Sequence, residues 1–499
     1  MSTSENTEDA GTAATRTTEE ESSLLDSILS QGMRARDDVA RDHGRNLIKE
    51  FVAQLLDPNI VVAKDTERTI QLRIAELDNL ISTQLNEIMH HPEFQKLEAS
   101  WRGLHYLVDQ TETGTNLKVR VLNVSKKDLL RDMERASEFD QSMLFKKVYE
   151  DEYGMFGGAP YGTLIGDYEF GRHPQDLSLL ERISNVAAAA HAPFLSAASP
   201  QLFGWDSFTE LSGPRDLAKI FDTVEYAKWK SFRDSEDSRY VGLTMPHTLA
   251  RLPYGQNTVP VEAFNYQEDV DGTDHHKYLW TNAAYALGTR ITNAFAKYGW
   301  TAAIRGVEGG GLVEGLPTHT FATDDGEVAL KCPTEIAITD RREKELNDLG
   351  FMALCHCKGT DYAAFFGAQS TQKPKLYDRD DANANARLST MLQYILCVSR
   401  FAHYLKAMAR DKIGSFMERD ECERWLNRWI KNYCLANPED AGPETKAKLP
   451  LREAQVVVRE VRGKPGCYEA VAHLRPHYQL DELSVSLRLV AELPQSKGG

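Results

Sequence analysis

Two amphipathic helices are predicted in the first fifth of the chain. Apolar residues recur every three or four positions from Val39 to Leu55 and again from Ile70 to Ile88. This spacing places them along one face of a helix. Pro58 ends the first run, and His91-Pro92 follows the second. We therefore expect two helices, each with one apolar side to bury.

The rest of the pattern mixes helices with strands. Alternating or short apolar runs predict a strand at Leu117–Val124, a short strand at Thr163–Ile165, and a hairpin formed by Phe351–Cys357 and Tyr362–Phe366. Further helices are predicted at Leu177–Ala190, Tyr278–Tyr298, Ile338–Leu349 and Arg387–Ile413. Arg387–Ile413 is apolar on more than one face, so we expect it to be enclosed by its own domain or by a neighbour. Ser125, Asp380 and Asp381 are predicted N-caps, and Gly350 is a predicted helix terminator.

Two strand patterns follow a linker at Asn437–Pro450 near the C-terminus. The first strand comprises Gln455, Val456, Val457, Val458, Arg459, Glu460 and Val461, and the second begins with Ser484, Val485, Ser486, Leu487, Arg488, Leu489 and Val490 and runs to Leu493. Two strands alone are marginal in water. They form either an ordinary hairpin inside one domain or part of a sheet that strands of other chains complete.

The N-terminal segment has a different composition. Residues 1–23 carry six acidic residues and one basic residue, with no large aliphatic residue after Met1, so we expect disorder there. A small apolar patch follows, formed by Leu24, Leu25, Ile28 and Leu29. This patch either packs on another chain or forms the first turn of a helix in its own domain.

Composition and charge narrow the class of protein. The 499-residue chain has a net charge of −16, which disfavours binding to nucleic acid. No apolar stretch approaches the roughly 20 residues that span a bilayer, so membrane insertion is not expected. The N-terminus lacks the features of a secretory signal. The seven cysteines have no framework-like spacing, which indicates reduced thiols and a cytoplasmic protein.

The motifs that carry chemistry are weak. Gly309-Gly310-Gly311 lacks the Gly-Lys-Ser/Thr of a phosphate-binding loop and fits a turn better. Cys355-His356-Cys357 is the best metal candidate, with Cys332 and His319 as further ligands at irregular spacing, although free cysteines are commonly buried. The pairs His90-His91 and His275-His276 lack zinc-protease spacing, and the aspartates at 378, 380 and 381 fit a helix cap better than a cation loop. The weak motifs disfavour an enzyme, although catalytic sites can also be assembled from scattered residues, and we assign no cofactor and no metal.

Several long blocks resemble the large sheath subunit of bacterial type VI secretion systems, the TssC/VipB family. The blocks are EFQKLEASWRGLHYLV (93–108), PYGTLIGDYEF (160–170), KSFRDSEDSRYVGLTMPHTLARLPYG (230–255), IRGVEGGGLVEGLP (304–317) and a stretch at 338–416 that begins ITDRREKELNDLGFMALCHCKG. The resemblance extends from about residue 24 to residue 494. It implies an α+β, multi-domain contractile-sheath protein whose inner domain resembles phage tail sheath proteins.

The resemblance also implies partners. Members of this family pair with a small sheath subunit (TssB/VipA), and the heterodimers stack with six-fold symmetry into a helical sheath around a tube of Hcp. The sheath stands on a baseplate that anchors it to the envelope, contracts to expel the tube and its spike, and is disassembled by the ClpV ATPase. A small sheet made of C-terminal strands is completed by the N-terminal arm of a neighbouring large subunit and by a strand of a small subunit. On this chain the arm corresponds to Leu24, Leu25, Ile28 and Leu29.

The predicted domain organisation has four parts. Residues 1–23 form an acidic leader, 24–60 a linking arm and helix, 61–330 a middle region shared with the small subunit, and 331–499 the inner domain with the inter-subunit strands. Two alternatives remain: a sheath protein of another, phage-tail-like contractile system, and, more remotely, a metal-binding enzyme centred on Cys355, His356 and Cys357.

Overall fold

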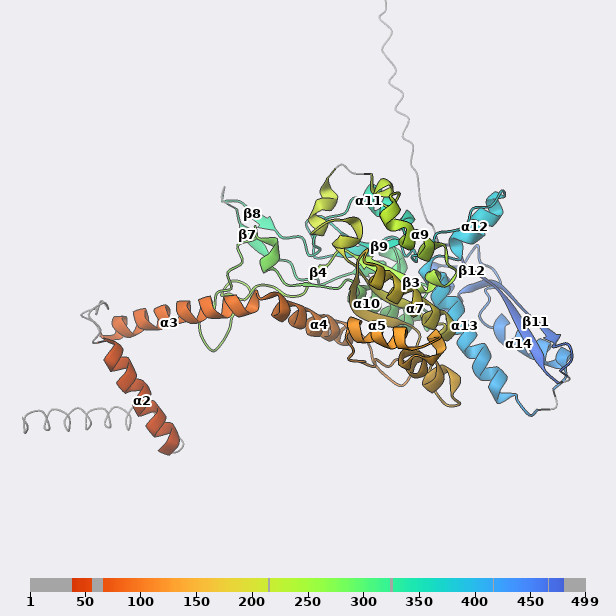
Figure 1. The fold of residues 1–499 in the computed structure, drawn as a ribbon, viewed down its shortest axis with the longest axis horizontal. Helices are drawn as coiled ribbons and strands as arrows, with labels where there is room; N and C mark the ends of the chain where they lie inside the picture. Colours follow the sequence, from red (N-terminus) through yellow and green to blue (C-terminus); the bar gives the residue numbers. More distant parts are fainter. Residues whose placement is uncertain are drawn as a thin grey trace, which may run out of the picture. The chain divides into compact units, whose positions relative to one another are not determined.

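The computed structural model describes residues 38–55, 66–213, 216–323, 326–415, 417–464 and 466–479 (Figure 1). These residues fall into two compact units. One contains the described residues up to Gln84 together with Glu262–Tyr266, and the other contains Leu85–Val261 and the described residues from Gln267 onward.

The two predicted N-terminal helices are confirmed as α2 (Asp38–Leu55) and α3 (Thr66–Met89). On α3, the apolar residues that share one face are all exposed: Ile70, Ile74, Leu77 and Ile81. The sequence therefore forms the amphipathic helix that its periodicity predicts, but the described part of this chain leaves its apolar face uncovered.

A six-stranded mixed sheet organises the larger unit. Its strands, in spatial order, are β1 (Leu164–Phe170), β2 (Phe194–Ala198), β3 (Val241–Met245), β9 (Phe351–His356), β10 (Ala363–Phe365) and β6 (Leu312–Val313). The first four are parallel to one another, whereas β10 runs antiparallel to both β9 and β6. Every residue of β2 and β3 is buried. Such continuously buried runs are typical of parallel strands that are covered on both faces.

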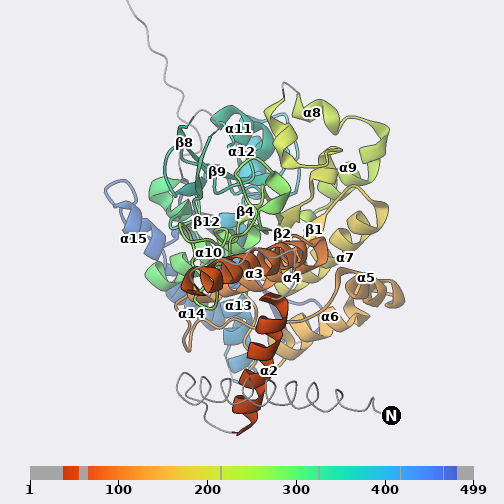
Figure 2. The ribbon, with the colours of Figure 1, turned by 90° about the vertical axis from the view of Figure 1, so that its left-hand side faces the viewer.

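Alternate residues of the strands enter two separate cores. Phe194, Phe351 and Ala353 pack with α7 (Pro174–Ala190), α9 (Ala227–Asp234) and α11 (Asp340–Asp348). Leu195 and Met352 instead pack with α10 (Ala284–Tyr298) and with the beginning of α13 (Leu392–Asp411). Helices thus cover both faces, and Figure 2 labels α7 and α10 beside β1 and β2.

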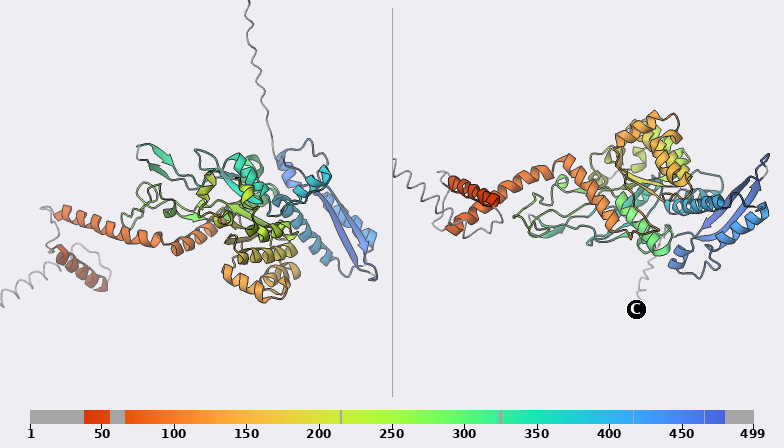
Figure 3. Two further views of the ribbon diagram at one scale, coloured as in Figure 1. Left: turned by 45° about the horizontal axis from the view of Figure 1, so that its top comes forward. Right: turned by 90° about the horizontal axis from the view of Figure 1, so that it is seen from below.

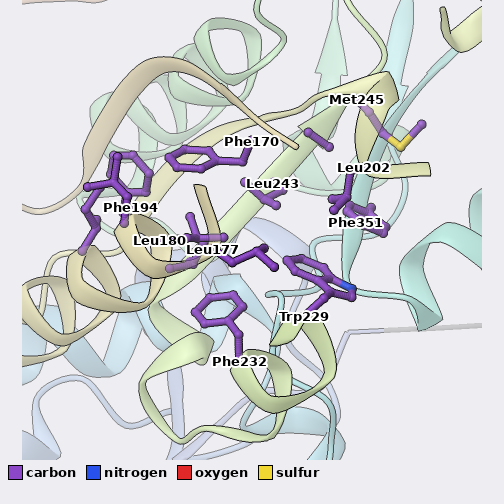
Figure 4. Packing of buried hydrophobic residues seen from close by; sticks show 14 of the residues in the cluster. Phe170, Leu177, Leu180, Phe194, Leu202, Trp229, Phe232, Leu243, Met245 and Phe351 are labelled. Carbon is purple, nitrogen blue, oxygen red and sulfur yellow. The ribbon is translucent and has the colours of Figure 1, made fainter. Parts of the chain in front are cut away.

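Aromatic rings fill the first of these cores (Figure 4). The Phe351 side chain is fully buried, and its ring stacks on that of Trp229 with centroids 5.7 Å apart. The ring centroid of Phe203 lies 4.9 Å from that of Phe351 on another side. Because interiors are close-packed, this cluster fixes how α9 and β9 lie against each other.

The remaining elements surround the sheet or extend from it. They are α4 (Pro92–Asp109), α5 (Lys126–Arg135), η1 (Phe139–Gln141), α6 (Met143–Phe145), η2 (Lys146–Gly154), η3 (Pro200–Phe203), η4 (Phe208–Ser212), α8 (Leu217–Ile220), η5 (Val224–Tyr226), η6 (Asp237–Tyr240), β4 (Thr248–Leu249), η7 (His275–Lys277), β5 (Trp280–Thr281), η8 (Val307–Gly311), β7 (Thr320–Ala322), β8 (Val328–Leu330), α12 (Asp380–Leu388), α14 (Arg419–Lys431), α15 (Pro443–Lys448), β11 (Leu451–Glu460) and β12 (Tyr468–Pro476).

Several predicted elements are confirmed. The hairpin of β9 and β10 pairs as expected, and α11 ends before Gly350, which has a φ of +86°. The Ser125 hydroxyl accepts the hydrogen bond of an N-cap from the main chain of Asp128. The mixture of helices and strands agrees with the predicted α+β class.

Other elements differ from their predictions. The long helix predicted at Arg387–Ile413 is two helices, α12 and α13, because the main chain between them pairs with another segment: Gln369 bridges Met391, and Ser370 donates to the carbonyl of Thr390. Asp380 and Asp381 lie in the first turn of α12 rather than at its N-cap. The strand predicted at Leu117–Val124 is absent, because this segment has no ladder partner in the described residues.

The central sheet also bears on the domain organisation. Strands β9 and β10 follow residue 330 in the sequence, yet they lie in the same sheet as β1, β2 and β3. Most of this sheet thus comes from the middle region, and two of its strands come from the region predicted to be the inner domain.

Replacing Phe351 with alanine is expected to lower the free energy of unfolding by about 3–5 kcal/mol, because a cavity replaces a fully buried ring. Urea denaturation followed by tryptophan fluorescence measures this change. The matched control is Val328→Ala, which removes apolar atoms from an exposed side chain of β8 and should cost less than about 0.5 kcal/mol. Equal losses in the two variants would contradict the assignment of this core.

Candidate functional site

The predicted inter-subunit strand Gln455–Val461 lies in β11 except for its last residue, and β11 pairs antiparallel with β12. Sequence analysis missed β12, whose alternation is weak, although Gly463, Pro465 and Gly466 lie between the two strands and are typical of a turn. The second predicted strand, Ser484–Leu493, and the arm patch at residues 24–29 lie outside the described residues. The described site is therefore the hairpin of β11 and β12.

Helix α14 occupies the outer edge of β11 (Figure 3). The amide of Asn427 accepts a hydrogen bond from the Val456 N–H at 2.9 Å and donates to the Val456 carbonyl at 2.6 Å. A carboxylate oxygen of Glu423 accepts from the Val458 N–H at 2.9 Å. At the beginning of the strand, main-chain bonds join Leu451 to Tyr433 and to the N–H of residue 435. Polar groups of the same chain thus satisfy this edge.

The outer edge of β12 is open. Val456 and Val458 face Ala472 and Ala470 in the register, and their N–H groups point away from β12. In an antiparallel pair, residues opposite such positions also direct their main-chain groups outward. The outward groups of β12 are therefore those of Ala470 and Ala472. No hydrogen bond from another element reaches the main chain of Tyr468–Leu474 in the part of the chain that the structure describes.

The hairpin rests on a small core of its own. Val456 and Val458 are buried against Leu426 and Ile430 of α14, and the cluster extends to Trp300 and Phe401. The Trp300 and Phe401 rings stack with centroids 4.4 Å apart. Because Phe401 belongs to α13, this helix packs against the core of the hairpin.

Helix α13 is also fastened to the sheet unit near η2 and α7. The Nε2 of His403 lies 2.9 Å from the carbonyl of Ala190, and burial lowers the pKa of His403 to about 4. The ring is therefore neutral at pH 7 and donates this hydrogen bond. The guanidinium of Arg410 donates to the carbonyls of Tyr153, Gly154 and Met155 at the end of η2. These bonds join the hairpin module to the sheet through one helix.

The metal candidates do not converge. Cys355 is buried in the core beneath α11, which raises the pKa of its thiol, whereas Cys357 is exposed. His356 instead hydrogen-bonds to Cys332, and this bond raises the pKa of His356. His319 lies elsewhere, with its Nδ1 2.7 Å from the hydroxyl of Tyr278. Among the described residues, no group of three or more His, Cys, Asp or Glu side chains is placed to hold a metal ion.

A charged cluster lies at the carboxyl ends of β1 and β3, with His247 largely buried, Glu335 buried and Glu169 half-exposed, and sequence analysis missed it. His247 contacts Glu169 at 3.0 Å and also bonds to Glu335. Burial by itself would lower the pKa of His247, but the two carboxylates outweigh it and raise this pKa to about 10. The Ser207 hydroxyl donates to Glu335. Burial would raise the pKa of Glu335, but its hydrogen bond with His247 outweighs this effect and holds the pKa well below its usual range, so this carboxylate is a weak base. The cluster joins segments that are far apart in the sequence, so no local sequence pattern predicts it.

The other candidates have structural roles. His90 and His275 each contact a glutamate, Glu268 and Glu335 respectively. Gly310 has a φ of +89°, which fits the predicted turn. Asp381 lines a pocket of about 670 Å³ between α12 and the end of β12, together with Arg475 and Tyr478.

Comparison with known proteins identifies the protein family of this chain. The family model described as the EvpB/VC_A0108 tail sheath N-terminal domain matches residues 71–372, and the model of the tail sheath gpW/gp25-like domain matches residues 381–493. The type VI secretion system sheath protein TssC1 of Pseudomonas aeruginosa is 54% identical over 484 residues, which cover 97% of each chain. The chain belongs to the EvpB tail sheath family. It is a structural subunit of a type VI secretion contractile sheath.

Two solved structures overlap with this sheath protein more loosely. The baseplate of the anti-feeding prophage matches with a TM-score of 0.36 and 9% identity, over 75% of this chain and 84% of that chain. The contracted helical sheath of the same prophage matches with a TM-score of 0.28 and 9% identity, over 62% and 66% of the two chains. No helix among the described residues of the sheath protein is long and apolar enough to span a membrane.

Replacing Asn427 with alanine is expected to lower the free energy of unfolding by about 1–3 kcal/mol, because the main chain of Val456 loses both of its edge partners. Hydrogen exchange should also become faster at the Val456 amide. Asn432→Ala, at the exposed end of the same helix, is the control and should change stability by less than about 0.5 kcal/mol. Unchanged exchange at Val456 in the Asn427 variant would contradict the edge assignment.

Proposed function

We propose that this sheath protein pairs with a small sheath subunit and that the heterodimers polymerise with six-fold symmetry around an Hcp tube. In this proposal the sheath stands on a baseplate anchored to the envelope, in the cytoplasm, and its contraction expels the tube. The chain acts mechanically and catalyses no reaction, and the ClpV ATPase supplies the hydrolysis that disassembles the contracted sheath. Membership of the sheath family supports this assembly as a whole.

The single observation that carries the proposal is the open edge of β12. An exposed strand edge is a template on which another strand adds through main-chain hydrogen bonds. The edge of β11 is already occupied by α14, so addition is restricted to one side of the hairpin. The incoming strand is the N-terminal arm of a neighbouring large subunit, around Leu24, Leu25, Ile28 and Leu29, and a strand of a small subunit extends the same sheet.

The small subunit also needs a broad contact surface, and two helices offer apolar faces. The exposed face of α3 carries Ile70, Ile74, Leu77 and Ile81. Within the larger unit, α4 packs on α10 through Gly103, where a Cβ atom would lie 2.4 Å from the Tyr285 ring. The other side of α4 exposes Leu97, Trp101 and Val108, and 66% of Trp101 is accessible to solvent. An exposed tryptophan among aliphatic residues is typical of a protein–protein contact.

We also propose a revised division of the chain into domains. Strands β9 and β10 favour a boundary after the central sheet, and the two family models leave a gap at residues 373–380. A middle domain ending near residue 372 and an inner domain beginning near 381 fit this arrangement better than a boundary at 330.

Deleting residues 1–30 is expected to leave a soluble heterodimer that builds no sheaths, because the arm that crosses to the neighbour is lost. Negative-stain electron microscopy of the chain co-expressed with its small subunit measures the outcome. A shorter deletion of residues 1–20 keeps the apolar patch and should still give sheaths. Contracted sheaths of full length from the 1–30 deletion would contradict the proposed role of the arm.

The substitution Ala472→Pro is expected to prevent sheath assembly while the hairpin stays folded. Proline removes an N–H that points outward from β12 and takes no part in the ladder with β11. Ala472→Thr keeps the N–H and serves as the control, which should assemble. Val471→Pro should instead unfold the hairpin, because its N–H belongs to the ladder. Normal sheaths from the Ala472→Pro variant would show that β12 is not the receiving edge.

A further inference from the structure

The segment Leu117–Val124 has the sequence of a strand but no strand partner. Leu117, Val119 and Val121 alternate with polar or charged residues, and the segment runs without helix, turn or bend up to Ser125. In the described part of the chain, its N–H groups donate to no main-chain carbonyl, and no ladder includes it. The alternation therefore favours a strand pairing that the described part of the chain does not supply.

Side chains nevertheless hold the segment in place at both ends. Near its start, Arg120 forms an ion pair with Glu152 of η2. At its end, the Tyr168 hydroxyl of β1 donates to the carbonyl of residue 124 at 2.8 Å, and the ammonium of Lys126 forms an ion pair with Asp176 at 2.7 Å. Side chains thus hold this main chain, while its N–H groups donate to no main-chain carbonyl among the described residues. Such preorganisation lowers the entropy cost of adding a strand.

Two apolar side chains in the middle of the segment are also uncovered. Val121 is 66% exposed and Leu122, which points to the opposite face, is 51% exposed. A strand that exposes apolar residues together with an unpaired main chain is the usual receptor for an extended peptide. Apolar side chains of an added strand would cover these residues.

Charge indicates which kind of strand fits. Residues 116–127 contain four basic residues and no acidic residue, within a chain whose net charge is −16. Lys118 and Lys127 are exposed. Pairing with the same segment of a second copy would bring like charges face to face, which is destabilising. A strand with acidic residues between its apolar ones complements this segment instead.

We propose that residues 117–124 form an open strand completed by β-strand addition, and that the added strand comes from a partner chain and alternates apolar with acidic residues. This contact is separate from the C-terminal hairpin. It adds a second place where main-chain hydrogen bonds join this protein to a neighbour.

The test uses the full-length chain and a fluorescent peptide of alternating glutamate and valine, EVEVEVE, with blocked ends. Fluorescence anisotropy should show saturable binding, and hydrogen-exchange mass spectrometry should show about tenfold slower exchange within residues 117–124 when the peptide is bound. A peptide of the same sequence in which every residue is N-methylated, and which therefore lacks the main-chain donors of both edges, should not bind. A peptide with lysine in place of glutamate should not bind either.

Two proline variants identify the edge that is used. Adjacent N–H groups of a strand point to opposite edges, so Val121→Pro and Leu122→Pro remove donors from opposite sides. We expect one of them to weaken peptide binding by about tenfold and the other to leave it unchanged. Val121→Thr and Leu122→Thr keep both donors and control for the lost apolar side chains. The melting temperature should stay the same in all four variants, because these N–H groups have no main-chain partner in the described residues.

Three results would each overturn the proposal. These are wild-type binding by both proline variants, equal binding of the N-methylated peptide, and unchanged exchange in residues 117–124 at saturating peptide. Tighter binding of a single-stranded oligonucleotide than of the acidic peptide would also overturn it, because the basic residues would then serve a nucleic acid. If a proline variant does not fold, the exchange measurement on the wild-type chain still decides.

Discussion

The hydrogen bonds between α14 and the outer edge of β11 leave only the outer edge of β12 uncovered in the described hairpin. Asn427 and Glu423 satisfy the main chain of Val456 and Val458 in the way that a neighbouring strand would. A hairpin without this cover would present two equivalent edges, and strands could add on either side and in more than one register. Because α14 closes the edge of β11, another strand can pair only along the edge of β12. Directional, non-symmetric contacts generate helical polymers rather than closed dimers.

The central sheet has a different character, since its inner strands β2 and β3 are buried on both faces. The aromatic core on one of these faces locks helices such as α9 against β9. Helix α13 connects this rigid unit to the hairpin, since it supports the hairpin core through Phe401 and binds η2 through Arg410. A load applied to the hairpin edge is therefore transmitted to the sheet through packed side chains.

The charged side chains whose pKa values are shifted most strongly stabilise the fold. Arg251 is buried between Glu98 and Glu268, with N–O distances of 2.7 Å to each, and joins α4 to the segment after β4. His247 forms a similar, largely buried pair with Glu335 and also contacts the half-exposed Glu169. Removing one member of such a buried pair leaves an uncompensated charge, which is strongly destabilising. These charged side chains connect segments that lie far apart in the sequence.

The sequence by itself determined the local elements and the family. The periodicity of Ile70–Ile88 specified α3, and the alternation of Gln455–Val461 specified β11, because both depend on residues close together in the chain. It did not reveal β2 or β3, whose short buried runs carry no period, nor β12, whose alternation is weak. Only the tertiary structure decided that, among the described residues, the outer edge of β12 is open, α3 and α4 have uncovered apolar faces, and residues 117–124 have no strand partner. Each of these depends on which distant segments satisfy a main chain or cover a face, and that information lies in the packing and not in any local pattern.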